Sequence, residues 1–378
     1  MSATEPPAIG LEVAVGVAGL PEAGPARRLA LHRAGAPAEV WSAVCAGRAS
    51  TLPGMAAVMG RRADVLNGRW AAAARAGDLP AEVARHRAAG VGLAVLGTST
   101  MPGVLASDIE PPSLLCLRGD PDVVVGPRVA IVGTRRCTRY GREVATELGY
   151  DLAAAGIAVV SGLAAGIDAA AHRGALEAGG APPIGVVGTG LDVVYPRQHA
   201  VLWQQVAEAG VLLSEHLLGT PPRAWHFPSR NRLLAALADI VVVVESDRSG
   251  GSMHTVDEAE ARQRVVMAVP GPVRSRASAG TNGLLRERAH VITDATDVLI
   301  LLGMSPAATR SAVERRPTPS PEAAAVLAAM GWEPAAADDL VRRTGRTVAT
   351  VAVALDELER DGWISRSGGW YERRAKPE

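Results

Sequence analysis

The chain has 378 residues, 48% of them hydrophobic, which is enough for two or three domains with a large core. Its formal net charge is zero, so any binding site for nucleic acid must be a local basic patch rather than a property of the whole surface. Lys376 is the only lysine, which excludes a Walker-type, Schiff-base or catalytic lysine from the body of the chain.

The cysteines and the apolar runs give no sign of export or of metal binding. Cys45, Cys116 and Cys137 are far apart, odd in number and without metal-ligand spacing. The N-terminus has no basic region followed by an apolar run, and no apolar run reaches membrane-spanning length. We therefore expect a reduced, cytoplasmic protein with no metal site and no membrane segment.

Residues 1–80 are predicted to be helices broken by Gly and Pro, and we expect them to form a helical domain of the SAM or helix-hairpin-helix kind. The stretch AGLPEAGPARRLALHRAG, from Ala18 to Gly35, resembles a turn that leads into a helix. It lacks the usual second hairpin glycine around Pro21–Ala23. A small helical packing domain is therefore the favoured interpretation.

Residues 81–304 are predicted to form one α/β domain. From Arg128 to about Leu302, short β-branched runs alternate with helical stretches, and the runs are VAIVG, IAVVSG, IGVVG, VLLSE, IVVVVES and VVMAVPG. Continuous apolar strands between helices predict a doubly wound, mostly parallel sheet covered on both faces. Ligands of such folds bind beyond the carboxyl ends of the strands.

The rest of the chain is predicted to be a linker and a smaller domain. Residues 305–320 are polar and rich in Pro, which is typical of a linker. Residues 321–378 predict a two-stranded ending after three helices, as in a winged helix: Glu322–Met330, Ala335–Thr344 and Val348–Asp361. The third helix has one arginine, Arg360, against four carboxylates: Asp356, Glu357, Glu359 and Asp361. We expect it to repel phosphates rather than to read a major groove.

A loop after the first strand of the repeating pattern combines one glycine with arginines: Gly133, Thr134, Arg135 and Arg136. A dinucleotide site would need further glycines here and a carboxylate after the second strand, where Ser161 stands instead. We therefore expect no cofactor. The helix that follows favours an anion at its start, and guanidinium groups bind phosphate, so the loop predicts a phosphate site. Arginines that only solvate a loop are the alternative.

A second glycine-rich loop, SGLAAGIDAAAH, begins at Ser161. Gly162 and Gly166 allow the backbone to approach a ligand closely, and Asp168 lies where it could cap the next helix. His172 follows four residues later on the same helical face, so an Asp168–His172 acid–base pair is one interpretation. A structural role for both residues is the favoured one.

The segment HFPSRNRLLAALAD, from His226 to Asp239, contains the only phenylalanine of the chain, Phe227. The residues that follow it include Pro228, Arg230, Asn231 and Arg232. An aromatic ring beside guanidinium groups is typical of proteins that bind single-stranded nucleic acid through base stacking and backbone charge. Packing of Phe227 in the core is the alternative.

The last of these loops, SDRSGGSMHTVDEAE, begins at Ser246 and contains Ser249 and Gly250 in a small-residue turn. The turn enters a helix and suits a second anion contact, but Ser249 lacks the G-x-S-x-G setting of a hydrolase nucleophile. With GTGLDVVYP (Gly188–Pro196), four loops at four strand ends would form one polar pocket. Its arginines and its few catalytic groups predict a binding protein that is not an enzyme.

The chain resembles the DNA-processing protein A family (DprA or Smf) in the order and spacing of its motifs: PPSLLCLRGD, VAIVGTRRCTRYG, VVSGLAAGIDAAAH, GTGLDVVYP, LLSEH, FPSRNRLLAALAD, VVVVES, AVPG and GTNGLL. The resemblance is strongest from Pro112 to about Thr293. It implies a helical N-terminal domain, an extended Rossmann-like core and a winged-helix end. The family's DNA contacts carry over onto Arg135 and onto a second segment: Phe227, Arg230, Asn231 and Arg232.

The resemblance also implies what the protein does and with what. Proteins of this family bind and protect single-stranded DNA and load the RecA recombinase on it during transformation. Self-association is implied near the helix LLRERAH and an edge strand in VITDATDVLILLG, which predicts a homodimer. The chain departs from the family pattern at Cys137, where Ser is usual, and at Met101, where Tyr is usual.

Two other functions stay open at this point. SGGSMHTVDEAE resembles a loop of the LOG-type nucleotide phosphoribohydrolases, in which Glu258 would help to cleave the base from a nucleoside monophosphate, but the proline before the glycines is missing. The third hypothesis is an interaction module in which a degenerate core only dimerises. Release of ribose 5-phosphate from AMP would identify the enzyme. The absence of both DNA binding and turnover would favour the third hypothesis.

Overall fold

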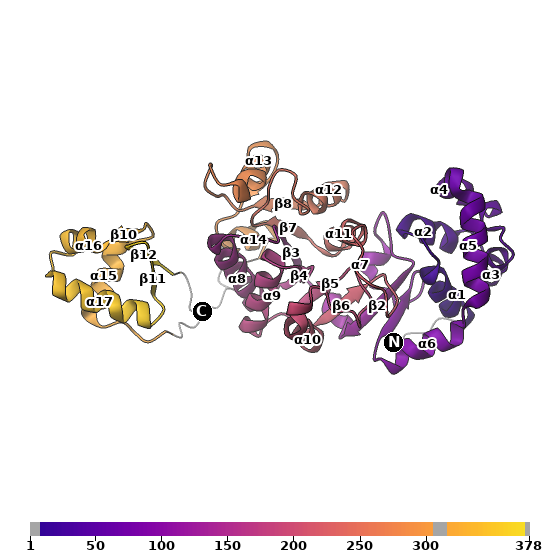
Figure 1. The fold of residues 1–378 in the computed structure, drawn as a ribbon, viewed down its shortest axis with the longest axis horizontal. Helices are drawn as coiled ribbons and strands as arrows, with labels where there is room; N and C mark the ends of the chain where they lie inside the picture. The colour runs from indigo at the N-terminus through magenta and orange to yellow at the C-terminus, as the bar shows by residue number, and fades with distance from the viewer. Residues whose placement is uncertain (1–7, 305–315, 375–378) are drawn as a thin grey trace. The chain divides into compact units, whose positions relative to one another are not determined.

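A nine-stranded sheet organises the first of the two compact units, Met1–Arg310 and Ser311–Glu378 (Figure 1). The structure is a computed structural model that describes residues 8–304 and 316–374. The strand order is β1-β2-β6-β5-β4-β3-β7-β8-β9. The strands are β1 (Gly92–Val95), β2 (Leu114–Gly119), β3 (Arg128–Val132), β4 (Ala158–Ser161), β5 (Ile184–Val186), β6 (Val211–Ser214), β7 (Ile240–Val243), β8 (Val265–Ala268) and β9 (His290–Val291).

The strands from β6 to β9 are parallel, and the strand order reverses at β3. From β3 outwards, β4, β5 and β6 lie in this order on one side, and β7, β8 and β9 lie in this order on the other. Val129 of β3 pairs with both Val159 and Ile240. The predicted doubly wound sheet is confirmed, because each of the six apolar runs forms a strand. The strands β1 and β2 extend it antiparallel beyond β6.

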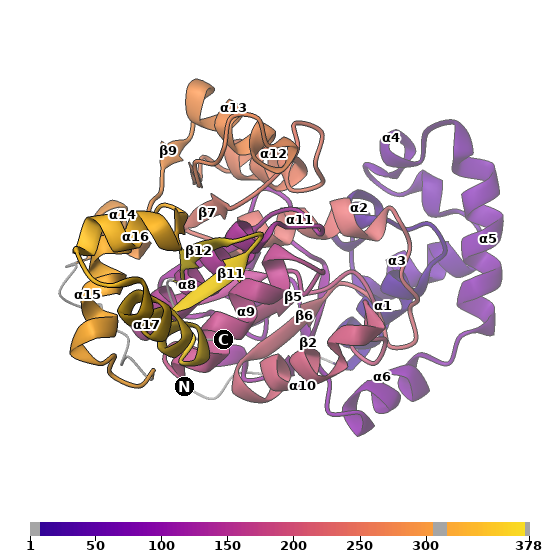
Figure 2. The same ribbon diagram turned by 60° about the vertical axis from the view of Figure 1, so that its left-hand side comes forward.

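Helices cover both faces of the sheet, as the alternation of buried side chains requires (Figures 1 and 2). Val129 and Ile131 of β3 face one helical layer, and Ala130 and Val132 face the other. The first layer consists of α8 (Arg139–Ala154), α9 (Ile167–Ala178), α10 (Ala200–Ala209) and α14 (Ala295–Leu301). The second consists of α7 (Gly103–Ala106), α11 (His226–Leu237), α12 (Met253–Ala261) and α13 (Ala279–Glu287).

The end of the sheet differs from the expectation for VITDATDVLILLG. Only Val291 of this stretch belongs to the edge strand β9, and most of the rest forms α14. Asp294 caps that helix by accepting a hydrogen bond from the Thr296 N–H at 2.7 Å, and Asp297 completes a capping box. A capping box satisfies N–H groups at a helix start, which explains why the apolar run after it is helical rather than extended.

Residues 8–88 form helices with a core of their own, as the sequence predicts. The largest buried side chains are Leu31, Met55, Met59, Leu66 and Trp70. The helices are α1 (Ala8–Gly19), α2 (Pro25–Arg33), α3 (Pro37–Cys45), α4 (Met55–Met59), α5 (Ala63–Ala76) and α6 (Leu79–Ala88). The expected boundary at residue 80 falls inside α6, so this helix leads directly towards β1.

A buried polar cluster joins α2 to the sheet. Arg28 donates a hydrogen bond to the Glu215 carbonyl oxygen at 2.6 Å, and the Glu215 carboxylate forms an ion pair with Arg232. Arg232 also donates to the Glu110 carbonyl oxygen at 2.6 Å, and its side chain is only 4% exposed. The sequence predicts that Arg232 contacts DNA, whereas in this structure protein groups surround its guanidinium.

The second unit is a winged helix, which confirms the prediction. Its helices are α15 (Pro321–Met330), α16 (Ala337–Thr344) and α17 (Val348–Arg360), and its strands are β10 (Ala335–Ala336), β11 (Ile364–Ser367) and β12 (Trp370–Arg373), in the order β10-β12-β11. The second helix starts later than expected because Ala335 and Ala336 pair with β12. In the predicted linker, residues 305–315 lie outside the described residues, and Ser320 caps α15.

Neither a membrane span nor a metal cluster occurs in the part of the chain that the structure describes. Within residues 8–304 and 316–374, every helix is too short or too polar to cross a bilayer. The same residues contain no group of three or more His, Cys, Asp or Glu side chains arranged to hold a metal ion.

We expect Glu215→Gln to lower the free energy of unfolding by about 3–5 kcal/mol, because Arg232 would become a buried charge without its counter-ion. Urea unfolding followed by circular dichroism would measure the change. Glu208→Gln, on the exposed face of α10, is the matched control and should change stability by less than about 0.5 kcal/mol. Equal effects of the two substitutions would contradict the role of Glu215.

Candidate nucleic-acid interface

The carboxyl ends of β3, β4 and β7 open into a pocket of about 680 Å³, at the point where the strand order reverses. Open α/β sheets bind ligands at this point because the loops after neighbouring strands diverge there. The pocket is lined by residues from four of the segments that the sequence singled out: Gly133, Thr134, Arg135, Asp168, Phe227, Pro228, Arg230, Asn231 and Gly250. Tyr195, Arg223 and His254 are among the other polar and aromatic residues of its lining.

The loop after β3 is held in place by backbone contacts on both sides. The Thr134 N–H donates to the Glu245 carbonyl oxygen at 2.7 Å, and the Thr134 carbonyl oxygen accepts from the Ile167 N–H at 3.3 Å. A β carbon at Gly133 would lie 2.6 Å from the Ile167 side chain, so no larger residue fits there. These contacts leave the exposed Arg135 on the pocket side, whereas the exposed Arg136 is not part of the lining.

The start of α8 is not the anion site that the sequence suggests. The buried Glu245 carboxylate accepts hydrogen bonds from the Thr138 N–H at 2.8 Å and from the Thr138 hydroxyl at 2.6 Å. The Thr138 hydroxyl oxygen in turn accepts from the Gly141 N–H at 3.1 Å. A carboxylate of the protein therefore occupies the place where a phosphate would bind. Of the two loop arginines that the sequence singles out, only Arg135 lines the pocket.

Phe227 contacts a cation and a second aromatic ring. The Arg135 guanidinium carbon is 5.0 Å from the centre of the Phe227 ring, and the Tyr195 ring centre is 5.3 Å from it on a plane tilted by 36°. Phe227 is half-buried and lines the pocket, and Tyr195 is 40% exposed. The three side chains form a flat, cationic and aromatic surface, which is the chemistry that stacks an unpaired base beside a phosphate.

Arg230 forms the floor of the pocket. It is 6% exposed and donates to the Val186 carbonyl oxygen, and a β carbon at Gly162 would overlap its guanidinium. Burial lowers the pKa of Arg230 to about 10, although the nearby Asp168 opposes the shift, so the group is cationic at neutral pH. Burial likewise raises the pKa of Asp168, whose carboxylate accepts the Gly162 N–H at 3.2 Å.

The remaining residues of the second loop support the site without lining it. The Ser161 hydroxyl donates to the Ile131 carbonyl oxygen at 2.6 Å. Gly166 has φ +83°, and a β carbon there would overlap the Thr134 carbonyl oxygen. His172 is fully buried against the Ile184 carbonyl oxygen at 3.2 Å, and burial lowers its pKa to about 4. Asp168 and His172 share no hydrogen bond, which favours a structural role for both residues over an acid–base pair.

The turn before α12 forms the wall opposite the loop after β4. Asn231 of α11 donates to the Gly251 carbonyl oxygen at 3.3 Å, which ties this turn to α11. Gly250 lines the pocket, whereas Ser249 is exposed outside it. Asp247 also lines the pocket, but its carboxylate is paired with Arg276 at 2.5 Å, which lowers its pKa. The pocket therefore keeps a net cationic lining from Arg135, Arg223 and Arg230.

Several lining residues are absent from the sequence-based set, among them Tyr195, Arg223 and His254. Tyr195 is the penultimate residue of GTGLDVVYP, a motif that the sequence places at a strand end without singling out the ring. His254 lies in the quoted stretch SDRSGGSMHTVDEAE but was not singled out, and Arg223 lies outside all the quoted motifs. The only signal for Arg223 is its position shortly before the start of the Phe227 helix, which is visible once α11 is known.

The residue on which the phosphoribohydrolase hypothesis depends lies outside the pocket lining. Glu258 is paired with Arg262 at 2.5 Å, and Arg262 is also paired with Asp108 at 2.8 Å. Glu258 is not part of the pocket lining. Its carboxylate therefore helps to fix α12 against the segment after α7, and it is not placed to act on a nucleotide in the pocket.

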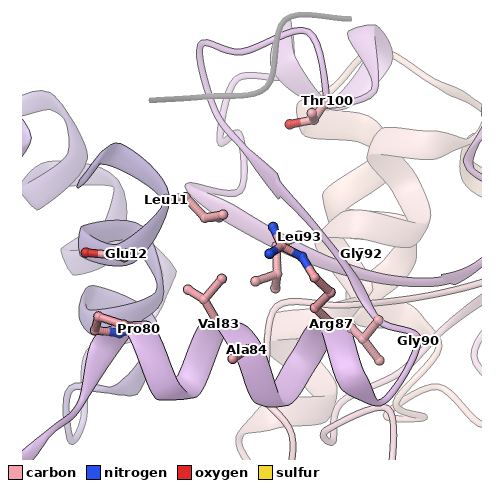
Figure 3. Close-up of a pocket in the computed structure, with 11 residues that line it drawn as sticks. Leu11, Glu12, Pro80, Val83, Ala84, Arg87, Gly90, Gly92, Leu93 and Thr100 are labelled. Atoms are coloured by element: carbon pink, nitrogen blue, oxygen red, sulfur yellow. The ribbon is translucent and has the colours of Figure 1, made fainter. Parts of the chain in front are cut away.

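A second pocket, of about 540 Å³, lies between α1, α6 and β1 (Figure 3). Figure 3 shows the Arg87 side chain rising from α6 beside Leu93 of β1, with Leu11 of α1 and Val83 nearby. Its charged lining residues are Arg87 and Glu12, and it has no aromatic side chain. This lining does not provide the stacking surface and the cluster of cations that the pocket at β3 provides.

Two family models match the chain. The model of DNA recombination-mediator protein A matches residues 93–303, which is more than half of the chain. The model of the DprA winged helix domain matches residues 295–369. The first match contains the pocket at β3, and the second contains α15, α16 and α17.

Known proteins are similar to part of the chain. Protein Smf of Escherichia coli is 34% identical over 282 residues, which cover 72% of this chain and 74% of that protein. A putative DNA processing protein DprA of Mycobacterium tuberculosis is 47% identical over 180 residues, which are 47% of this chain and 46% of that protein. The chain thus spans about half the length of that relative.

Two solved structures are similar in fold. DNA processing protein A of Streptococcus pneumoniae matches with a TM-score of 0.63 and 28% identity, covering 79% of this chain and 98% of that one. DNA processing protein A of Helicobacter pylori, whose structure is described for its single-stranded DNA binding mode, matches with a TM-score of 0.51 and 32% identity over 56% of this chain and 95% of that one. The chain belongs to the DNA recombination-mediator protein A family.

Proposed function

We propose that the pocket at β3 binds single-stranded DNA without catalysing a reaction on it. The observation that carries the proposal is the surface formed by Arg135, Phe227 and Tyr195 at the end of a cationic pocket. The similarity to the Helicobacter pylori protein supports it, because that protein is described as binding single-stranded DNA. The cysteines are free, as is usual for a protein that acts in the reducing cytoplasm.

A single strand suits this site better than a duplex. The half-buried Phe227 ring lies inside a concave pocket, so only an unpaired base that leaves its neighbours can stack on it. Paired bases in a duplex expose their edges rather than their faces. Arg135 and Arg223 are exposed, and each can neutralise a phosphate of a strand that enters the pocket.

The same proposal includes protection of the bound strand and its delivery to the RecA recombinase. The family's description as a recombination mediator supports this step, together with the motif resemblance. Assembly of RecA on single-stranded DNA should be faster with the protein than without it, and Phe227→Ala should remove the gain. An unchanged assembly rate with a protein that binds DNA would contradict the delivery step alone.

We expect salt to weaken binding of oligo-dT, with a log–log slope of about −2 if about three phosphates are neutralised at roughly −0.7 each. Arg135→Ala should make the slope shallower by roughly 0.7 and weaken all sequences alike, because it removes one phosphate contact. Fluorescence anisotropy at several salt concentrations, with matching duplex alongside, would measure this. Arg136→Ala is the matched control outside the pocket. Salt-independent binding, or a preference for duplex, would refute the proposal.

We expect Phe227→Ala to weaken single-strand binding by about 1–3 kcal/mol, the effect of losing one stacked base. The half-buried ring should contribute less to folding than a core residue, whose truncation costs about 3–5 kcal/mol. Phe227→Tyr, which keeps a ring, should restore most of the affinity. Affinity and melting temperature measured on the same proteins separate the two roles; a loss of stability with unchanged affinity would assign Phe227 to the core.

The winged helix is proposed to bind a protein rather than DNA. The α17 carboxylates are held in local contacts: Glu357 accepts the Ser320 N–H at 2.6 Å, and Asp356 pairs with Arg360 at 2.6 Å. Deleting residues 320–378 should change single-strand affinity by less than about threefold, under about 0.7 kcal/mol. A tenfold loss from a truncated protein with unchanged melting of the first unit would show that the winged helix binds DNA.

A homodimer is proposed at the β9 edge of the sheet. Three apolar side chains are exposed there, namely Val291 at 54%, Ile300 at 60% and Leu301 at 42%. Exposed apolar clusters of this kind mark contact surfaces. Sedimentation equilibrium should give a dimer at micromolar concentration, and Ile300→Asp should shift it towards monomer. A monomer for the unchanged protein at tens of micromolar would exclude this interface.

A further inference from the structure

A further cavity adjoins the pocket at β3, on the other side of the segment that leads into α11. It has a volume of about 430 Å³ and lies between the turn after α1 and the loop after β6. We call it the side pocket; the turn contributes Leu20–Ala23 to it, and the loop contributes His216–Pro221. Arg223 is exposed and lines both cavities, so the two linings share its side chain.

The side pocket repeats the chemistry of the first one. Trp225 is 45% exposed and lines it, and the Trp225 ring meets the His226 ring edge-on at 4.1 Å. His226 stacks in turn on His216 at 4.0 Å, so a layer of flat rings supports the tryptophan. Burial lowers the pKa of His216 to about 3 and also lowers that of His226, so these rings are neutral at neutral pH.

Cations surround this aromatic layer. Arg28, Arg85 and Arg223 line the side pocket. The Arg223 carbonyl oxygen accepts the His226 N–H at 3.0 Å, but its guanidinium has no hydrogen-bond or ion-pair partner among residues 8–304 and 316–374. The buried Nε of Arg28 also lacks a hydrogen-bond acceptor within the same residues. Of the two lining carboxylates, Glu22 is paired with Arg62 at 2.6 Å and with Arg69, and Glu82 is paired with Arg85 at 2.6 Å.

We propose that the side pocket binds the nucleotides that follow, on the same single strand, those held in the pocket at β3. A base would stack on Trp225, and Arg223 would bind the phosphate between the two cavities. This inference rests on the proposed function and extends it. Continuity through Arg223 favours DNA over a protein partner, because a strand that leaves the first pocket passes this guanidinium. Because the turn after α1 lines the side pocket, the helical N-terminal part would then help to set the length of DNA that is bound.

The test compares oligo-dT of increasing length, from about 4 to about 16 nucleotides, the range of site sizes for a single-strand binding module. Trp225→Ala should leave the shortest oligonucleotides unaffected and weaken the longest about tenfold, as expected for one lost base stack. Trp225→Phe should restore most of that loss. Trp332→Ala, which removes a tryptophan that is 69% exposed in the winged helix, is the matched control and should change neither.

Photo-crosslinking with 5-iodouracil at each position of a long oligonucleotide gives an independent readout on the unchanged protein. Some positions should crosslink to Tyr195 or Phe227, and positions further along the strand should crosslink to Trp225. If crosslinks stay confined to the first pocket and Trp225→Ala binds every length normally, the side pocket does not hold DNA and the inference is wrong. If the unchanged protein binds no oligonucleotide, or if Phe227→Ala has no effect at any length, the proposed function fails instead.

Discussion

The position of β3 between β4 and β7 is the constraint on which the candidate site depends. Parallel pairing on both sides of β3 places the carboxyl ends of the three strands at one edge, and the reversal of strand order makes the following loops diverge. The loop after β3 is then pinned by the Glu245 and Ile167 backbone. Arg135 points into the pocket as a consequence of these contacts and of the absence of a side chain at Gly133.

Burial distinguishes several arginines that stabilise the fold from two that are exposed in the pocket. Arg128, Arg232 and Arg262 are buried with backbone carbonyl groups and carboxylates as partners, because a buried charge without partners is costly. Arg135 and Arg223 are exposed and line the pocket. A protein of zero net charge can therefore present a local cationic surface while many of its arginines stabilise the fold.

The helical N-terminal part and the core are connected through polar contacts as well as apolar ones. Arg28 of α2 reaches the Glu215 backbone, and Arg85 of α6 donates to the Leu218 carbonyl oxygen at 3.0 Å. Ala14, Val15 and Ala18 of α1 pack against Val95 and Leu114 of the sheet edge. These contacts hold the turn after α1 near the start of α11, where the aromatic residues of the site lie.

The sequence by itself determined the α/β class, the six core strands and the winged helix, because these depend on local periodicity and on turn residues. It also identified the loops of the site, since glycines and arginines at strand ends are visible without a fold. Tertiary structure decided which arginine is available: Arg232 and Arg230 lie two residues apart, yet only Arg230 lines the pocket, because successive positions on a helix face different neighbours. Tertiary structure alone also brought Tyr195 to Phe227, Glu245 to the start of α8 and Arg223 to the linings of two cavities. These contacts join segments far apart in the chain, and no local pattern encodes such distances.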